Sequence, residues 1–139
     1  MTRVLVCGGR AYEDRQRVFE ILAQRQPSVV IQGCARGADS FAGEWADLNG
    51  VEHLRFPADW DNLGRAAGPI RNQQMLDEGR PDLVIAFPGS KGTRDMMRRA
   101  VLAGVPVEMI DPTPAQLELI ESLGKSSVAG QDRLTQPRG

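Results

Sequence analysis

The segment that follows the apolar run Leu83–Phe87 has the residue types of a phosphate-binding turn. It runs from Pro88 to Thr93 with the sequence PGSKGT and leads directly into a stretch with helical periodicity. Glycine lets the backbone approach a ligand without a Cβ in the way. The free N–H groups at a helix start, together with the positive end of the helix dipole, favour an anion. We therefore predict that a phosphate accepts hydrogen bonds at this turn. The donors are backbone N–H groups and one hydroxyl from Gly89, Ser90, Gly92 and Thr93.

Two further glycine-rich turns follow the apolar runs Val4–Cys7 and Val29–Ile31. The first contains Gly8, Gly9 and Arg10, and the second runs from Gly33 to Gly37 and includes Arg36. Three such turns predict one shared nucleotide-like ligand, with Arg10 or Arg36 as the cationic partner of its phosphate. No Walker spacing is present, which disfavours a P-loop NTPase, and Lys91 is expected to face solvent.

Asp39 lies two residues after the second turn, at the start of a predicted helix. Its carboxylate is suited to accept hydrogen bonds from ribose hydroxyls. It is equally suited to complement the positive end of the helix dipole. Both interpretations stay open on the sequence.

The apolar pattern predicts five strands. The runs Val4–Cys7, Val29–Ile31 and Leu83–Phe87 are unbroken, which is typical of strands covered on both faces by helices. The run Val51–Phe56 alternates polar with apolar residues, and Val105–Ile110 contains a proline, so both are predicted to be edge strands. The simplest right-handed arrangement is an α/β Rossmann-like three-layer sandwich with a mainly parallel five-stranded sheet of order 3-2-1-4-5.

This order places the candidate residues at one crevice. The first and fourth strands are neighbours and their following helices lie on opposite faces, which opens a crevice at the carboxyl edge of the sheet. A further helix is predicted over Gly68–Leu76, with proline in its first turn and a polar inner face that is a candidate functional surface. The long loop before it contains Trp60, which is suited to stack on a base, to cover the site, or to anchor the loop by packing.

Composition bounds the classes of protein and partner. The chain has 139 residues, 41% of them hydrophobic, which suits a single core. The net charge of -1 lacks the broad basic field that non-specific nucleic-acid binding needs, so nucleic acid is an unlikely partner. One histidine and two cysteines show no metal-ligand spacing, and neither a metal nor a cofactor is expected.

The chain divides at the break after Ile110. We expect residues 1–110 to form the nucleotide-binding domain and residues 111–139 to form a short helix, over Ala115 to Leu123, and a mobile tail. No apolar run approaches the roughly 20 residues that cross a bilayer. We expect a cytoplasmic protein without membrane contact.

The chain resembles the SLOG superfamily, specifically its YspA-like branch. The resemblance rests on the segments Val6–Arg10, Gly37–Asp39, Ala67–Asn72 and Pro88–Thr93, and it extends from Arg3 to about Ile110. It implies a Rossmann-like fold that binds or processes nucleotides and nucleotide-derived ligands, including ones related to NAD or ADP-ribose. LOG-type phosphoribohydrolases and DNA-processing proteins of the DprA type are related classes.

The LOG-type enzymes imply a catalytic pair. They cleave the N-glycosidic bond of nucleoside monophosphates with an arginine on one helix and a glutamate just after the glycine-rich turn. Arg71, with Met75 four residues on, is similar to their R-x-x-x-M helix. The glutamate position holds Met96 here, and Asp95 lies one residue earlier, about 100° around the helix. The resemblance thus makes Arg71 and Asp95 the catalytic candidates.

The leading hypothesis is a SLOG-type nucleotide-binding protein that recognises the phosphate and ribose of a nucleotide or an NAD- or ADP-ribose-like ligand. The alternatives are a nucleoside 5'-monophosphate phosphoribohydrolase and a DprA-like nucleic-acid-binding protein. We expect a homodimer, with Met97, Val101 or the helix after Pro114 as its apolar contact. The predicted ligand-binding residues are Gly8, Gly9, Arg10, Arg36, Gly37, Asp39, Asn72, Pro88, Gly89, Ser90, Gly92 and Thr93.

Overall fold

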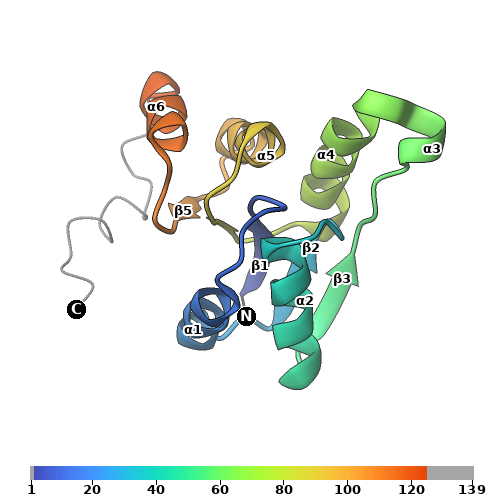
Figure 1. The fold of residues 1–139 in the computed structure, drawn as a ribbon, viewed down its shortest axis with the longest axis vertical. Coiled ribbons are helices and arrows are strands. Elements are labelled where there is room, and N and C mark those ends of the chain that lie inside the picture. The colour runs from blue at the N-terminus through green and yellow to red at the C-terminus, as the bar shows by residue number, and fades with distance from the viewer. Residues whose placement is uncertain (1, 125–139) are drawn as a thin grey trace.

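The computed structural model describes residues 2–124 of the chain, and the tail predicted over residues 125–139 lies outside them. Strands and helices alternate along most of this length (Figure 1). The strands are β1 (Arg3–Cys7), β2 (Val29–Gln32), β3 (Glu52–Arg55), β4 (Leu83–Ala86) and β5 (Val107–Met109). The helices are α1 (Arg15–Arg25), α2 (Ala38–Leu48), α3 (Trp60–Leu63), α4 (Ala67–Gly79), α5 (Lys91–Leu102) and α6 (Pro114–Ser122).

The five strands form one sheet in the order β3-β2-β1-β4-β5, and every neighbouring pair is parallel. This confirms the predicted order, and β3 and β5 are the edges. Leu5 of β1 is paired in register with Ile31 of β2 on one side and with Val84 of β4 on the other. The three unbroken apolar runs therefore occupy the centre of the sheet, where both faces are covered.

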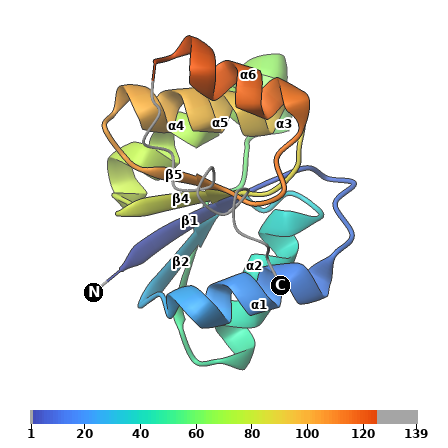
Figure 2. The same ribbon diagram turned by 90° about the vertical axis from the view of Figure 1, so that its left-hand side faces the viewer.

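Helices cover both faces of the sheet, as Figure 2 shows edge-on. Helices α1 and α2 lie on one face, with a core that includes Val4 and Val6, and α4, α5 and α6 lie on the other, with a core that includes Leu5 and Val84. Alternate residues of one strand thus enter opposite cores, as the period of a strand requires.

The core also contains two residues predicted to contribute a dimer contact. Met97 is fully buried and Val101 is 8% exposed, and both pack in the core on the α5 face. They are therefore core residues and offer no apolar surface to a second copy. The homodimer itself stays a prediction.

The segment between β3 and α4, predicted as a loop, contains a short helix. The side chain of Asp59 accepts a hydrogen bond from the backbone N–H of Asn62 at 3.3 Å and caps α3. A 3-10 turn over Gly64–Ala66 then joins α3 to α4. Four residues are too few for helical periodicity to be visible in a sequence, and none of the residues of α3 is buried.

Helix α6 holds the segment that follows β4 in place. The Thr113 side chain and Gln116 form a reciprocal capping box at its start. The Gln116 side chain is fully buried and donates to the carbonyl of Phe87 at 3.0 Å. The turn that follows Phe87 is therefore anchored to the fold. Within residues 2–124 no helix is long and apolar enough to cross a membrane.

Candidate functional site

The three glycine-rich turns meet at the carboxyl edge of the sheet because they pack directly against one another. The Gly9 N–H donates to the Pro88 carbonyl at 2.9 Å. A Cβ on Gly8 would lie 2.6 Å from the Cβ of Ala38. Gly37 has φ of +83°, and a Cβ there would overlap the carbonyl oxygen of Gly9. These glycines thus serve first to bring the backbones of the turns together.

A cavity of about 740 Å³ opens beside these turns, lined by residues from the end of β1, from α3 and α4, and from the start of α5. Nine of the predicted site residues line it: Gly8, Arg10, Asp39, Arg71, Asn72, Ser90, Gly92, Thr93 and Asp95. Five do not. Arg36 lines a smaller neighbouring cavity, and the remaining four belong to the packed turns: Gly9, Gly37, Pro88 and Gly89. As ligand contacts all fourteen stay predictions.

The start of α5 is an uncapped helix end on this cavity. The N-cap residue Ser90 makes no side-chain capping bond, and the first turn holds no acidic residue. Within residues 2–124 the N–H groups of Lys91, Gly92 and Thr93 donate to no acceptor. Lys91 and Arg94 add positive charge where the helix dipole is already positive. These like charges repel one another in the free protein, and a bound anion would reduce that repulsion.

In the turn before α2, the chain's own side chains accept from the backbone N–H groups, although the first turn of α2 itself has no side-chain cap. The N–H groups of Gly33 and Ala35 donate to Oδ2 of Asp39, at 3.1 Å and 3.4 Å. The N–H of Cys34 donates to Oε1 of Gln32 at 2.5 Å. The second glycine turn therefore holds its backbone donors for internal use. Asp39 nevertheless lines the cavity.

Asp39 is 5% exposed, and its environment sets its charge. Burial raises the pKa of Asp39 to about 6, because a buried carboxylate loses hydration. The nearby Arg71, the N–H groups of Ala35 and Gly33, and Arg10 oppose that rise by stabilising the charged form. Asp39 is thus poised to change protonation in a mildly acidic solution.

Arg71 joins helix α4 to the ends of two strands. Its Nη1 donates to the carbonyls of Gly33, after β2, and Phe56, after β3, the latter at 3.5 Å. Its Nε donates to Oδ1 of Asn72 at 3.0 Å. Burial lowers the pKa of Arg71, and the proximity of Asp39 opposes that effect. The predicted catalytic arginine is therefore a structural tie as well as a cavity residue.

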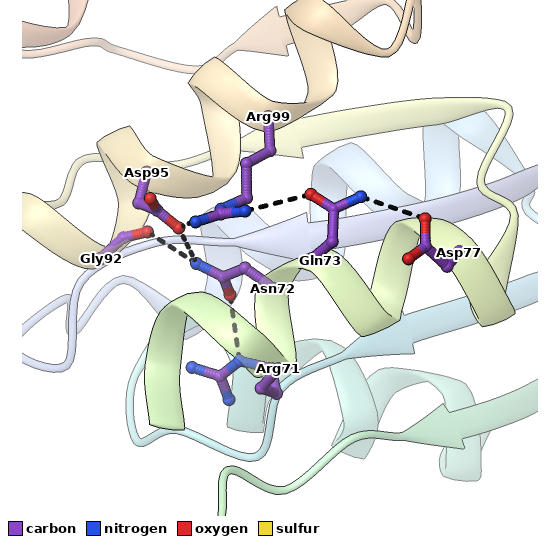
Figure 3. A network of polar contacts seen from close by, with 7 residues as sticks. All are labelled: Arg71, Asn72, Gln73, Asp77, Gly92, Asp95 and Arg99. Carbon is purple, nitrogen blue, oxygen red and sulfur yellow. Dashed lines mark hydrogen bonds and ion pairs between the residues drawn. The ribbon is translucent and has the colours of Figure 1, made fainter. Parts of the chain in front are cut away.

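Asp95, on α5, points toward Asn72 on α4, as Figure 3 shows. Its Oδ2 accepts from Nδ2 of Asn72 at 2.9 Å and from Nε of Arg99 at 2.8 Å. Asn72 therefore bridges the two catalytic candidates, Arg71 and Asp95. Met96, at the position of the family glutamate, is 1% exposed and belongs to the core.

Four cationic residues that were not among the predicted site residues also line the cavity: Arg65, Lys91, Arg94 and Arg98. With Arg10 and Arg71 they make six cations against the two carboxylates Asp39 and Asp95. Lys91 is exposed to solvent, as expected, and it also lines the cavity. The absence of an acidic residue from the first turn, Lys91 to Arg94, and the four-residue spacing from Arg94 to Arg98 are signals that a sequence could have given. Arg65 carries no such signal.

Solved structures of low sequence identity share this fold. DprA from Streptococcus pneumoniae superposes with a TM-score of 0.72 at 21% identity, covering 98% of this chain. This chain spans 62% of that protein. The molybdenum cofactor carrier protein of Chlamydomonas reinhardtii gives a TM-score of 0.64 at 17% identity and 94% coverage of each chain. The fold is thus a Rossmann-like α/β fold shared with these proteins.

Two further comparisons define the family. Residues 2–62 match the model of the YspA, cpYpsA-related SLOG family. The Gene 61 protein of Mycobacterium phage D29 is 42% identical over 120 residues, covering 77% of this chain and 94% of that protein. The chain belongs to the YspA-related SLOG family. The similarity to the phage protein extends over nearly the whole length of that protein.

Proposed function

We propose that this protein binds the phosphate and ribose of a nucleotide or nucleotide-derived ligand in the cavity at the carboxyl edge of its sheet. Membership of the SLOG family supports a role in binding nucleotides or related molecules. The observation that carries the proposal is the start of α5, where three backbone N–H groups without an acceptor in the described chain border a cavity with six cations.

Each part of the ligand has a proposed partner. The phosphate accepts from the N–H groups of Lys91, Gly92 and Thr93 and pairs with a cationic side chain such as Arg10. The ribose hydroxyls donate to Oδ1 of Asp39, an oxygen that accepts no hydrogen bond from the described residues. The cavity of about 740 Å³ is large enough for a mononucleotide and is in the range typical of small-molecule sites.

The test compares nucleoside monophosphates with the corresponding nucleosides by thermal shift and titration calorimetry. We expect the monophosphates, and not the nucleosides, to raise the melting temperature, because a ligand at about 100 times its Kd adds about 2.7 kcal/mol of stability. Lys91→Gln should weaken binding several-fold. The matched control is Arg80→Asn, which removes an exposed positive charge at the opposite edge of the sheet. Equal binding of nucleosides and monophosphates would contradict the proposal.

A second candidate function is hydrolysis of a nucleoside 5'-monophosphate. It is favoured by Arg71 and Asp95 lining one cavity and being linked through Asn72. The ion pair between Asp95 and Arg99 at 2.8 Å weighs against it, because it engages the carboxylate that would stabilise an oxocarbenium-like centre. Chromatography for free base separates the two functions: release that is lost in Asp95→Asn establishes the enzyme.

A third candidate, binding of nucleic acid, is favoured by the six cavity cations. DprA from Helicobacter pylori has a single-stranded DNA binding mode, and its structure superposes at a TM-score of 0.64 and 16% identity. The net charge of -1 weighs against this function. Retention of labelled single-stranded DNA at physiological ionic strength, weakening as salt rises, would establish it.

A further inference from the structure

A second cavity, of about 290 Å³, adjoins the first. The two share Arg10, Ala35, Trp60 and Arg71 as lining residues, so these four side chains stand between them. The smaller cavity is completed by the turn after β2, which includes Arg36, and by the segment before α3. The smaller cavity is therefore an extension of the site already described, separated from it by these four side chains.

The charge of the smaller cavity is one-sided. Arg10, Arg36 and Arg71 line it, and no carboxylate does. Within residues 2–124 the side chains of Arg10 and Arg36 form no hydrogen bond or ion pair. Five other arginines are paired with carboxylates: Arg15, Arg17, Arg25, Arg55 and Arg99. Asp39, which lines the larger cavity, offsets part of the charge of Arg10 and Arg71. The three cations still repel one another across the smaller cavity, and an anion between them would reduce that repulsion.

Trp60 holds the wall between the two cavities. The guanidinium of Arg10 lies over its ring, 5.4 Å from the centroid, which is within the range of a cation–π contact. The ring also lies against α4, where a Cβ on Gly68 would be 3.3 Å from Cη2. Trp60 is nevertheless 47% exposed. It therefore offers aromatic surface to a ligand that extends from one cavity into the other.

We propose that the smaller cavity is a second anion subsite, formed by Arg10, Arg36 and Arg71, so that the ligand is a nucleotide with two phosphoryl groups. One phosphoryl group lies at the start of α5 and the other lies between the arginines. The inference rests on the proposed function, since it assigns the first phosphoryl group to the same site. It differs in requiring a second group that a nucleoside monophosphate lacks.

Titration calorimetry with three adenine ligands tests the inference. AMP carries one phosphoryl group, ADP-ribose carries two that are adjacent, and adenosine 3',5'-bisphosphate carries two that are separated. We expect at least one of the two-phosphate ligands to bind tenfold or more tightly than AMP. The comparison of the two shows which spacing the cavities accept.

Arg36→Gln is the decisive variant because Arg36 lines the smaller of the two adjoining cavities and not the larger one. We expect it to reduce the ratio of two-phosphate to AMP affinity at least fivefold, whereas Arg80→Asn leaves that ratio unchanged. Circular dichroism checks that both variants fold. Because Arg36 is exposed, its replacement should not prevent folding.

The outcomes separate the two proposals. Binding of AMP with no gain from a second phosphoryl group, or a ratio unchanged in Arg36→Gln, overturns the second subsite and leaves the proposed function standing. No binding of any of the three ligands contradicts both. Retention of single-stranded DNA without binding of the small ligands overturns the inference in favour of a continuous path for a polynucleotide.

Discussion

The starts of α2 and α5 share one local structure but carry side chains of opposite charge. Each follows a central strand and a glycine-containing turn at the same edge of the sheet. At α2, the buried carboxylate of Asp39 accepts from the N–H groups of Gly33 and Ala35 in the preceding turn, while the first turn of the helix has no side-chain cap. At α5, the N–H groups of the first turn have no acceptor in the described chain, and Lys91 stands where an acid would be favourable.

The comparison teaches that glycine spacing shows where backbone donors are accessible but not what occupies them. An acidic residue in the first turn supplies an internal anion, as Asp39 does. Basic residues such as Lys91 and Arg94 leave the position to an external one. The charge of the first turn is thus the better guide to which of two similar turns binds a ligand.

The largest expected effect comes from removing the carboxyl group of Asp39 at the start of α2. Asp39→Ala should lower the free energy of unfolding by about 3 to 4 kcal/mol, since each buried N–H left without an acceptor costs about 1–3 kcal/mol. Urea denaturation at pH 5, where the neutral form of Asp39 predominates, measures this loss. Asp39→Asn keeps an acceptor oxygen and should lose less. A loss below about 0.5 kcal/mol in Asp39→Ala would show that the α2 turn does not depend on its carboxyl group.

A pH dependence follows from the same residue. The pKa of Asp39 is about 6 in the folded protein and 3.8 ordinarily, so the folded state holds the proton more tightly. The resulting stability is full below pH 4 and is lost as the pH rises through 6. By the usual conversion this amounts to ~3 kcal/mol at most.

The measurement is the difference in unfolding free energy between wild type and Asp39→Asn from pH 4 to pH 7. This subtraction cancels groups that titrate alike in both, while Arg71, Arg10 and Cys7 are the charged or titratable groups coupled to Asp39. The difference should fall with rising pH. A flat or rising difference would contradict the raised pKa.

Filling the α5 site with an acid should stabilise the free protein and impair its function. Lys91→Glu places a carboxylate in the first turn of α5, which should add about 0.3–1 kcal/mol of stability. It should also weaken the binding of AMP at least tenfold. Leu102→Glu is the matched control, because it adds an acid to the exposed far end of the same helix. If Lys91→Glu keeps full affinity, the phosphate does not bind at the start of α5.

The smallest effect is expected at Ser90. Its side chain makes no capping bond, so Ser90→Ala should change the free energy of unfolding by less than about 0.5 kcal/mol. A working N-cap serine would cost about 1 kcal/mol when replaced by alanine. Urea denaturation of Ser90→Ala beside Thr113→Ala, which removes a working cap at α6, makes the contrast direct.

The sheet could be read from the sequence because its signals are local. An unbroken apolar run such as Leu83–Phe87 marks a central strand, and the proline in Val105–Ile110 marks an edge, so the strand order follows from few assumptions. The short helix α3 could not be found this way, since its residues make no buried stripe. Its start is capped by the carboxylate of Asp59, a contact over three residues that the apolar pattern does not report.

The grouping of most candidate residues at one cavity was predictable from the sequence, and the contacts among them were not. Arg71, Asn72 and Asp95 do line one cavity. That Asn72 joins the other two, and that Arg71 contacts the carbonyls after β2 and β3, depends on how α4 packs on the sheet. Such long-range packing leaves no trace in residue spacing.

The packing of Gly9, Gly37 and Pro88 against one another also constrains how this protein can change over evolutionary time. Surface connections ordinarily accept extra residues with little harm. Here the Gly9 N–H meets the Pro88 carbonyl at 2.9 Å and the Gly9 carbonyl fills the space beside Gly37. An insertion in any one connection would separate all three, so relatives of this chain should vary in length elsewhere and keep these three connections fixed.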